Sequence, residues 1–413
     1  MKKILIIGNG ANAYALAKNL SSKHEVYITP SSDTLKEFCT TLDIRETSIN
    51  ELLEYVLENQ IDMTIPMSSI SILAGISDLF NKHNQPIFAP SKNASEISFN
   101  KVMAKKLLYK LHVQTPKFGI FEKENMALDY LKNQKLPFVI KTNDSNSAVV
   151  LTSLQSAKNI TNSIYIEKNN KLIIEDYIYG TPFSFYAVTD GYKALPIGSS
   201  LNYKYSLDGD GGQITSGMAS CVPNYKLSIG DEYMLMDNVI YPVLEYLENG
   251  GCPYLGIIGI NGIKTDDGNI FVLGWNSYMQ DSDCAAILNL IKDDIYAIME
   301  ACVNGSFSDD INSVLLKDEY FVSLVLKNIN KESKDNPIIG IENLDEDTFI
   351  TYNPNVKKNK YLEYSAPSGQ VCIITTKGST VSSAAQKAYL EAKEVDFKGI
   401  SYRKDICRAA VFS

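Results

Sequence analysis

The chain has 413 residues, of which 45% are hydrophobic and 21% charged, a balance that excludes a disordered or fibrous protein and predicts several folded domains. Its 39 basic and 48 acidic side chains give a net charge of −9, so a nucleic-acid interface is not expected. Seven scattered cysteines and three histidines include no CxxC pair, so neither disulfides nor a zinc site is predicted. No apolar run reaches the roughly 18 residues of a membrane span, and the cytoplasm is the expected location.

Strands and helices alternate in the first part of the chain. Four strands are predicted, at residues 4–7, 26–29, 62–66 and 86–88. Three helices are expected between these strands. The first spans residues 11–20, the second begins at a capping box at Ser48–Glu51, and the third runs from Ser68 or Ser69 to about Lys82. This βα alternation predicts an open, doubly wound parallel sheet with helices on both faces.

The pattern changes after a helix expected at 101–111, because paired short strands replace the alternation. Further strands are predicted at 137–141, 148–152, 171–177, 183–189 and 371–376, and a hairpin at 257–264 and 270–273. Residues 200–217, which contain four glycines, are expected to form a long polar loop. Helices are predicted at 231–248, 283–302 and 380–394.

Four short segments carry the residue types of a nucleotide site. Gly8 and Gly10 follow the first strand, where backbone N–H groups can face a phosphate, although such turns recur in many α/β sheets. Lys141 ends an apolar strand before a polar loop. Its side chain, like that of Lys101, either neutralises nucleotide phosphates or simply reaches water. The strand through residues 175–178 offers backbone groups to an adenine edge, or is an ordinary edge strand.

Two later segments offer polar groups to a substrate or a metal. The loop at 200–217 is either functional or disordered, and its polar side chains include Lys204, Asp208, Asp210 and Thr215. Asn276 with Asp281 or Asp283 supplies oxygen ligands of the kind that Mg²⁺ prefers, or forms part of a surface turn.

Taken in order, these segments resemble the phosphoribosylamine–glycine ligase (glycinamide ribonucleotide synthetase) family of the ATP-grasp superfamily. The resemblance runs over nearly the whole chain and is carried by residues 6–10, 100–101, 139–141, 174–177, 204–223 and 401–406. It implies an α/β fold in three parts: a doubly wound domain at 1–92, a two-lobed ATP-grasp unit at 93–316 with its small lobe at about 116–182, and a small C-terminal α/β domain at 317–413.

The resemblance implies an ATP-dependent ligase that joins a small carboxylate to a small amine, releasing ADP and phosphate, as in purine biosynthesis. ATP would be bound by Lys101, Lys141, Glu175, Tyr177, Ile178 and Lys204. The substrate would be bound by Gly8, Gly10, Asp208, Asp210 and Thr215. Mg²⁺ would be bound by Asn276 and Asp281.

Several positions depart from the family pattern. Gly274-Trp275-Asn276 replaces Glu-Phe-Asn, so a metal carboxylate is missing, and Tyr278 replaces an arginine. Residues 145–148 replace a Gly-Lys-Gly phosphate loop, and residues 11–14 replace Gly-Arg-Glu-His. These changes imply an altered substrate or reduced activity.

Two alternatives remain. The first is a catalytically degenerate homologue that acts as a nucleotide-binding or assembly protein, with a protein partner. The second, a dinucleotide-dependent dehydrogenase, rests only on residues 8–10, and the second strand ends in Ile28-Thr29-Pro30 without an acidic ribose ligand.

Overall fold

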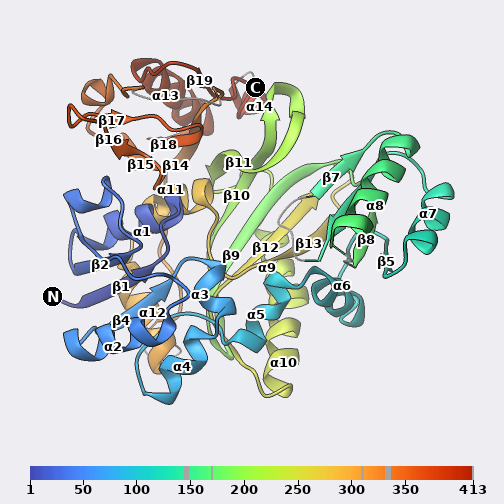
Figure 1. Cartoon of the computed structure of the whole chain (residues 1–413), viewed down its shortest axis with the longest axis horizontal. Helices are drawn as coiled ribbons and strands as arrows, with labels where there is room; N and C mark the ends of the chain where they lie inside the picture. Colours follow the sequence, from blue (N-terminus) through green and yellow to red (C-terminus); the bar gives the residue numbers. More distant parts are fainter. Residues whose placement is uncertain (144–147, 169–170, 308–310, 331–335, 412–413) are drawn as a thin grey trace.

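Three large β-sheets organise the molecule, with helices packed between and around them (Figure 1). The computed structural model describes the whole chain except residues 144–147, 169–170, 308–310, 331–335 and 412–413. The N-terminal elements (blue) and a small lobe (cyan to green) lie on opposite sides of the largest sheet in Figure 1, with the C-terminal elements (red) at the top. Among the described residues, no helix is long and apolar enough to cross a membrane.

The N-terminal sheet is parallel and doubly wound, as predicted. Its strand order is β3-β2-β1-β4, formed by Thr40–Thr41, Glu25–Thr29, Lys3–Ile7 and Met63–Pro66. Side chains of β1 alternate between two cores: Ile4 and Ile6 pack with α1 (Ala11–Leu20), whereas Leu5 and Ile7 pack with α2 (Ile49–Asn59) and α4 (Ile76–Lys82). Burial on both faces explains the unbroken apolar run of β1.

Three local predictions in this region are wrong. Ser48 precedes α2 but makes no side-chain cap, because its backbone (φ −84°, ψ 57°) is not in the extended form that a capping residue adopts. The helix expected to reach Lys82 divides into α3 (Ser69–Leu73) and α4 at Gly75, whose φ of +85° interrupts the helix. Residues 86–88 form a single bridge, Thr64 to Ile87, rather than a fourth strand.

The small lobe is an antiparallel sheet covered by two helices on one face. Its strand order is β5-β8-β6-β7, formed by Phe118–Phe121, Leu172–Asp176, Phe138–Thr142 and Ala148–Leu151. Ile140 and Ile174 belong to the core shared with α7 (Glu124–Lys132) and α8 (Leu154–Lys168). Because side chains alternate along a strand, Lys141 and Glu175 point away from these helices.

The largest sheet has nine strands and continues into the C-terminal part of the chain. Its main order is β13-β12-β9-β10-β11-β14-β18-β15, with β19 (Ile400–Ser401) paired to β14. The strands span Ile270–Asn276, Tyr254–Lys264, Thr181–Gly191, Ala194–Leu207, Gly211–Val222, Tyr320–Asn328, Gly369–Gly378 and Phe349–Tyr352. The pairing of β11 with β14 carries the sheet across the domain boundary predicted at residue 317.

The prediction of a polar loop at 200–217 is wrong, since β10 and β11 form an antiparallel hairpin there. Its tip is a single turn, Asp208–Asp210, in which Gly209 (φ +66°) and Asp210 (φ +54°) are left-handed. The outer half of the hairpin is largely exposed, so its strands lack the apolar alternation that signals a strand in sequence.

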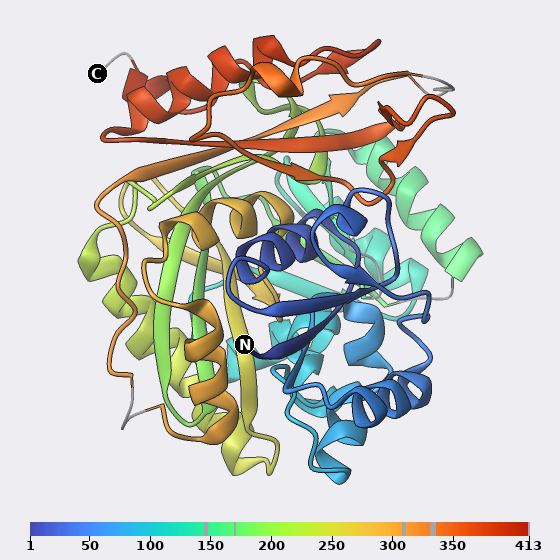
Figure 2. The same cartoon turned by 90° about the vertical axis from the view of Figure 1, so that its left-hand side faces the viewer.

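Helices cover both faces of this sheet (Figure 2). On one face lie α5 (Lys92–Phe99), α6 (Lys101–Lys110), α9 (Ile229–Leu235) and α10 (Tyr241–Asn249), the last two joined by a π-helical turn at Met236–Ile240. On the other face lie α11 (Asp281–Leu290) and α12 (Ile295–Asn304), and α13 (Val381–Glu394) packs on the C-terminal strands. Short elements complete the described chain: η1 (Leu35–Glu37), η4 (Ile341–Asn343), β16 (Lys357–Lys358), β17 (Tyr364–Ser365) and α14 (Arg408–Val411). All seven cysteines are free thiols.

A buried arginine fastens the C-terminal segment to the tip of the β10–β11 hairpin. The side chain of Arg403 is 2% exposed and makes two hydrogen bonds to Asp405, at 2.8 and 2.6 Å, and one to Asp210 at 2.8 Å. The backbone N–H groups of Gly209 and Lys404 donate to Asp405 and Asp208, each at 2.8 Å. These contacts hold two distant parts of the sequence in one place.

We expect Arg403→Ala to lower the free energy of unfolding by about 3 kcal/mol, because it removes the buried guanidinium whose charged hydrogen bonds join Asp405 to Asp210. Lys404→Ala is the matched control, since its side chain is exposed and its hydrogen bond uses only the backbone; we expect a change within about 0.5 kcal/mol. Urea unfolding of the three proteins measures both effects, and equal losses in the two variants would contradict the assignment.

Candidate functional site

A carboxylate buried between two ammonium groups lies on the inner face of the small lobe. Glu175 of β8 accepts from Lys141 Nζ of β6 at 2.9 Å, and its other oxygen lies 3.3 Å from Lys105 Nζ of α6. The side chains of Glu175 and Lys105 are at most 2% exposed, and that of Lys141 is 13% exposed. Lys105 also donates to Thr115 Oγ1 at 2.7 Å.

This cluster carries one net positive charge and is arranged to meet an anion. Burial would raise the pKa of Glu175, but the nearby ammonium groups of Lys141 and Lys105 lower it below its usual value, so the carboxylate stays ionised. Burial lowers the pKa of Lys105 to about 8, and the charge of Glu175 opposes that fall. Two cations share one anion, so positive charge remains available to a phosphate group.

The structure brings together Lys141 and Glu175, two of the predicted nucleotide residues, and adds Lys105, which the sequence analysis missed. Lys101 begins α6 and is half-buried, and Lys105 lies four residues later on the same face of that helix. The spacing between these two lysines is the only sequence signal for Lys105, because α6 also contains Lys106 and Lys110.

The predicted adenine hinge links the two sheets. Tyr177 and Ile178 lie between β8 of the small lobe and β9 of the large sheet, and both are half-buried. The hydroxyl of Tyr177 lies 3.2 Å from that of Tyr205 on β10, so the hinge also contacts the hairpin. The predicted phosphate loop at 145–147 lies outside the described residues.

Neutral amides occupy the predicted metal position. Asn276 of β13 and Asn261 of β12 exchange hydrogen bonds at 3.0 and 3.1 Å, and Gln280 donates to Asn276 Oδ1 at 3.4 Å. Beside them, Ser184 donates to Asn202 Oδ1 at 2.7 Å. Among the residues with a described position, no three of His, Cys, Asp or Glu are arranged to hold a metal ion.

The nearby carboxylates of α11 are engaged elsewhere. Asp281 Oδ1 accepts from the backbone N–H of Asn12 at 3.1 Å, and Asp283 accepts from Asn202 Nδ2 and the Tyr186 hydroxyl at 2.7 and 2.8 Å. Burial raises the pKa of Asp281, and the hydrogen bond from Asn12 opposes that rise. The lysines of this site therefore fit the phosphates of a nucleotide. The neutral amides and the already bonded carboxylates do not fit the oxygen ligands that a divalent cation requires.

The predicted substrate residues fall in two separate places. Gly8 and Gly10 lie where the N-terminal domain meets α11; a Cβ on Gly8 would come within 3.2 Å of the Met67 backbone, and one on Gly10 within 3.5 Å of Asp281 Oδ1. The side chain of Asn12 donates to the Met279 carbonyl at 3.1 Å and so fixes this junction. Substrate binding by these glycines stays a prediction.

The hairpin holds the other predicted residues. Asp208 and Asp210 bind the segment around Arg403, as described above. Lys204 Nζ donates to the Ser216 carbonyl at 3.2 Å, and Thr215 Oγ1 donates to the Lys204 carbonyl at 2.8 Å. Burial lowers the pKa of Lys204, while the charges of Asp283 and Asp281 oppose that fall. Substrate binding by Asp208, Asp210 and Thr215, and nucleotide binding by Lys204, stay predictions.

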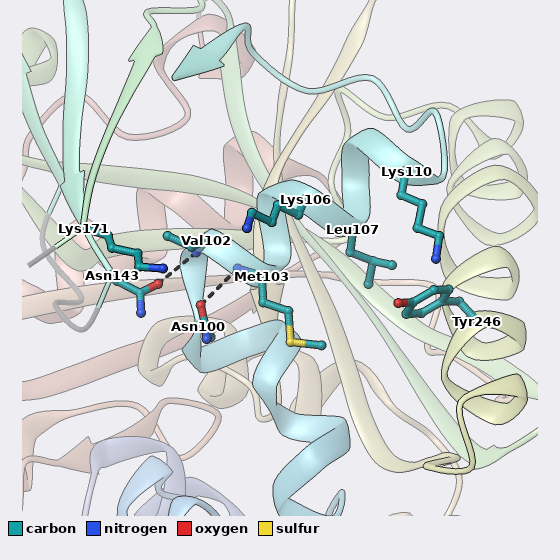
Figure 3. Close-up of a pocket in the computed structure, with 9 residues that line it drawn as sticks. All are labelled: Asn100, Val102, Met103, Lys106, Leu107, Lys110, Asn143, Lys171 and Tyr246. Carbon is teal, nitrogen blue, oxygen red and sulfur yellow. Dashed lines mark hydrogen bonds between the residues drawn. The ribbon is translucent and has the colours of Figure 1, made fainter. Parts of the chain in front are cut away.

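A cavity of about 460 Å³ lies beside α6 (Figure 3). Helical geometry places the α6 residues that line it on a different face of the helix from Lys105. Figure 3 shows Lys110 beside the ring of Tyr246 and the amide oxygen of Asn143 facing the Val102 N–H, which donates to it at 2.9 Å. Its lining comprises Asn100, Val102, Met103, Lys106, Leu107, Lys110, Asn143, Lys171 and Tyr246.

Comparison with known proteins identifies the family. Residues 2–98 match the description "Phosphoribosylglycinamide synthetase, N domain", and residues 99–284 match the ATP-grasp (A) domain of the same synthetase. The chain belongs to the phosphoribosylglycinamide synthetase family. The two matches together span well over half of the chain and place this family member in the ATP-grasp superfamily.

Relatives in the family match end to end. The phosphoribosylamine–glycine ligase of Caldanaerobacter subterraneus is 28% identical, over 98% of this chain and 99% of the relative, and that of Clostridium acetobutylicum is 27% identical over the same shares. The crystal structure of the Thermotoga maritima phosphoribosylamine–glycine ligase superposes with a TM-score of 0.82 at 22% identity, over 98% of this chain and 99% of that one.

A more distant neighbour has a ligand. The biotin carboxylase domain of the Hydrogenobacter thermophilus 2-oxoglutarate carboxylase, a complex with MgADP, ADP and bicarbonate, superposes with a TM-score of 0.73 at 13% identity, over 97% of this chain and 91% of that one. The likeness confirms the predicted ATP-grasp architecture.

The buried lysine of this site predicts a pH dependence of stability. Lys105 has a pKa of about 8 in the folded protein and an ordinary value of 10.5, so the unfolded chain binds the extra proton between these pH values. The contribution of Lys105 to the free energy of unfolding therefore rises with pH between 8 and 10.5 and is constant below pH 8.

Lys105→Met removes this titration. We expect the free energy of unfolding of the natural protein, relative to the variant, to increase from pH 8 to pH 10 in urea titrations. Parallel pH profiles for the two proteins would show that Lys105 has an ordinary pKa.

Proposed function

We propose that this protein binds an adenine nucleotide between the small lobe and the large sheet. The observation that carries the proposal is the buried cluster of Lys105, Glu175 and Lys141, which leaves one positive charge on the inner face of the small lobe. Lys101, at the start of α6, joins these lysines in holding phosphates. Backbone groups of residues 175–178 hold the adenine edge, and Lys204 extends the positive charge from the hairpin.

We further propose that the reaction is ATP-dependent ligation of a carboxylate to an amine. A carboxylate oxygen attacks the γ-phosphorus of ATP, forming an acyl phosphate and ADP; the amine then attacks the acyl carbon, and phosphate leaves as the amide forms. The lysines hold the charge of the phosphates during both steps. Family membership and the end-to-end match to ligases support this reaction class.

The substrate differs from phosphoribosylamine in this proposal. Tyr278 stands where the family has an arginine, and it packs near Phe99 with ring centroids 6.5 Å apart. An uncharged phenol cannot make the two parallel hydrogen bonds that a guanidinium offers to a carboxylate or phosphate. Asn12 is likewise committed to the junction with α11, through its bonds to Met279 and Asp281.

A thermal-shift titration with ATP and ADP tests nucleotide binding. A nucleotide present at 100 times its Kd stabilises the native state by about 2.7 kcal/mol, which raises the melting temperature measurably. We expect Lys141→Ala to abolish the nucleotide-induced shift, because it removes a phosphate-binding cation.

Lys106→Ala is the control, since Lys106 is an exposed lysine of α6 that lies outside the buried cluster; this variant should retain the full shift. The shift within each protein is compared, rather than absolute melting temperatures, because Lys141→Ala also removes a partner of Glu175. No shift in the natural protein at millimolar nucleotide would refute the proposal.

A second candidate function is nucleotide binding without ligation, as a sensing or assembly protein with a protein partner. The neutral amide pair at the predicted metal position favours this second function. Attack by a carboxylate adds negative charge at the phosphates, so ligation needs more charge stabilisation than binding does, and neutral amides supply none. Release of ADP and phosphate, measured over a panel of amines and carboxylates, separates the two functions. Ligation requires release that depends on both substrates, whereas the second candidate predicts nucleotide binding with no such release.

A further inference from the structure

One short stretch of the large sheet, at the predicted metal position, carries amides and a glycine in place of carboxylates. In the β12–β13 hairpin Asn261 is paired with Gly274, and Gly259 with Asn276. The register then shifts, so that Leu273 has no partner before Gly262 pairs with Val272. Gly274 and Asn276 are two residues apart on β13, and they share a face with Asn261.

The two amides satisfy each other. Asn261 Nδ2 donates to Asn276 Oδ1 at 3.1 Å, and Asn276 Nδ2 donates to Asn261 Oδ1 at 3.0 Å. Each amide oxygen that could bind a cation therefore already accepts a hydrogen bond, and neither carries a charge. Mg²⁺ is bound in proteins through one or two carboxylates together with substrate phosphates, so this pair is a poor substitute.

Position 274 lacks a side chain but has room for one. A Cβ built on Gly274 meets no atom within 4 Å, and its φ lies outside the left-handed range that excludes other residues. Neighbouring glycines differ: a Cβ on Gly259 would come within 2.6 Å of the Tyr186 ring. Gly274 is therefore not required by packing, in contrast to Gly259.

We infer that this protein binds its nucleotide without a divalent cation held by the protein, and that Gly274 is the position that determines this. The inference rests on the nucleotide binding proposed above. Lys141 meets the phosphate charge, while the buried Lys105 offsets the charge of Glu175. Any metal ion reaches the site only as part of the nucleotide that enters. The carboxylates of α11 do not compensate, because Asp281 and Asp283 are bonded to Asn12, Asn202 and Tyr186.

The test compares the natural protein with Gly274→Glu and Gly274→Gln, which have side chains of equal length that differ in charge. ADP affinity is measured by calorimetry in Mg²⁺ and, separately, in EDTA. We expect the natural protein and Gly274→Gln to bind ADP with a Kd that changes less than about twofold between the two conditions. We expect Gly274→Glu to bind more weakly in EDTA, because its carboxylate repels the phosphates, and about tenfold more tightly once Mg²⁺ is added.

Each outcome has a distinct meaning. Binding by the natural protein that requires Mg²⁺ would overturn the inference and leave nucleotide binding intact, and this comparison needs no variant. No ADP binding in either condition would overturn the proposed function and the inference with it. A folded Gly274→Glu protein, verified by its circular dichroism, that binds ADP equally with and without Mg²⁺ would show that position 274 does not determine the cation requirement.

Discussion

A single carboxylate, Glu175, holds α6 against the inner face of the small lobe. It is buried, and it stays ionised because Lys105 and Lys141 approach it from two different elements. Burying three charges is costly, and the cost is offset only while all three remain in contact. The relative position of α6 and the β6–β8 pair is therefore set by electrostatics rather than by apolar packing alone. The proposed nucleotide site depends on that arrangement.

Much of the fold could be predicted from the sequence because apolar periodicity is strong where elements are buried. The unbroken run in β1 and the spacing of α1 are examples, and both lie in the core. The β10–β11 hairpin could not be predicted, because its outer half is exposed and polar and its glycines resemble those of a loop. The helix expected to reach Lys82 divides at Gly75, because a glycine within a helical pattern either continues the helix or adopts the left-handed backbone that ends it, and the pattern alone does not decide between the two.

The candidate site was only partly predictable. Lys141 stands out because it ends the strand predicted at 137–141, and Glu175 because the hinge segment at 174–177 resembles that of the family. Lys105 is one of four lysines in α6 and is distinguished only by its buried partner. The amide pair needed the tertiary structure as well, since Asn261 lies fifteen residues before Asn276 and becomes its partner through the bulged hairpin. Asp208 and Asp210 look like ligands in sequence, but their observed partners are Lys404 and Arg403, almost two hundred residues away.

The continuity of the large sheet gives the C-terminal strands a protective role. β11 has β10 on one side and β14 on the other. Over residues 219–221, its backbone groups are therefore paired along both edges of the strand. Without β14, the inner part of β11 would present unpaired N–H and C=O groups beside an apolar stretch from Met218 to Val222. Such an edge recruits strands from other molecules. A chain cut before Tyr320 would therefore be prone to aggregation, even though the family match over residues 2–284 ends well before that point.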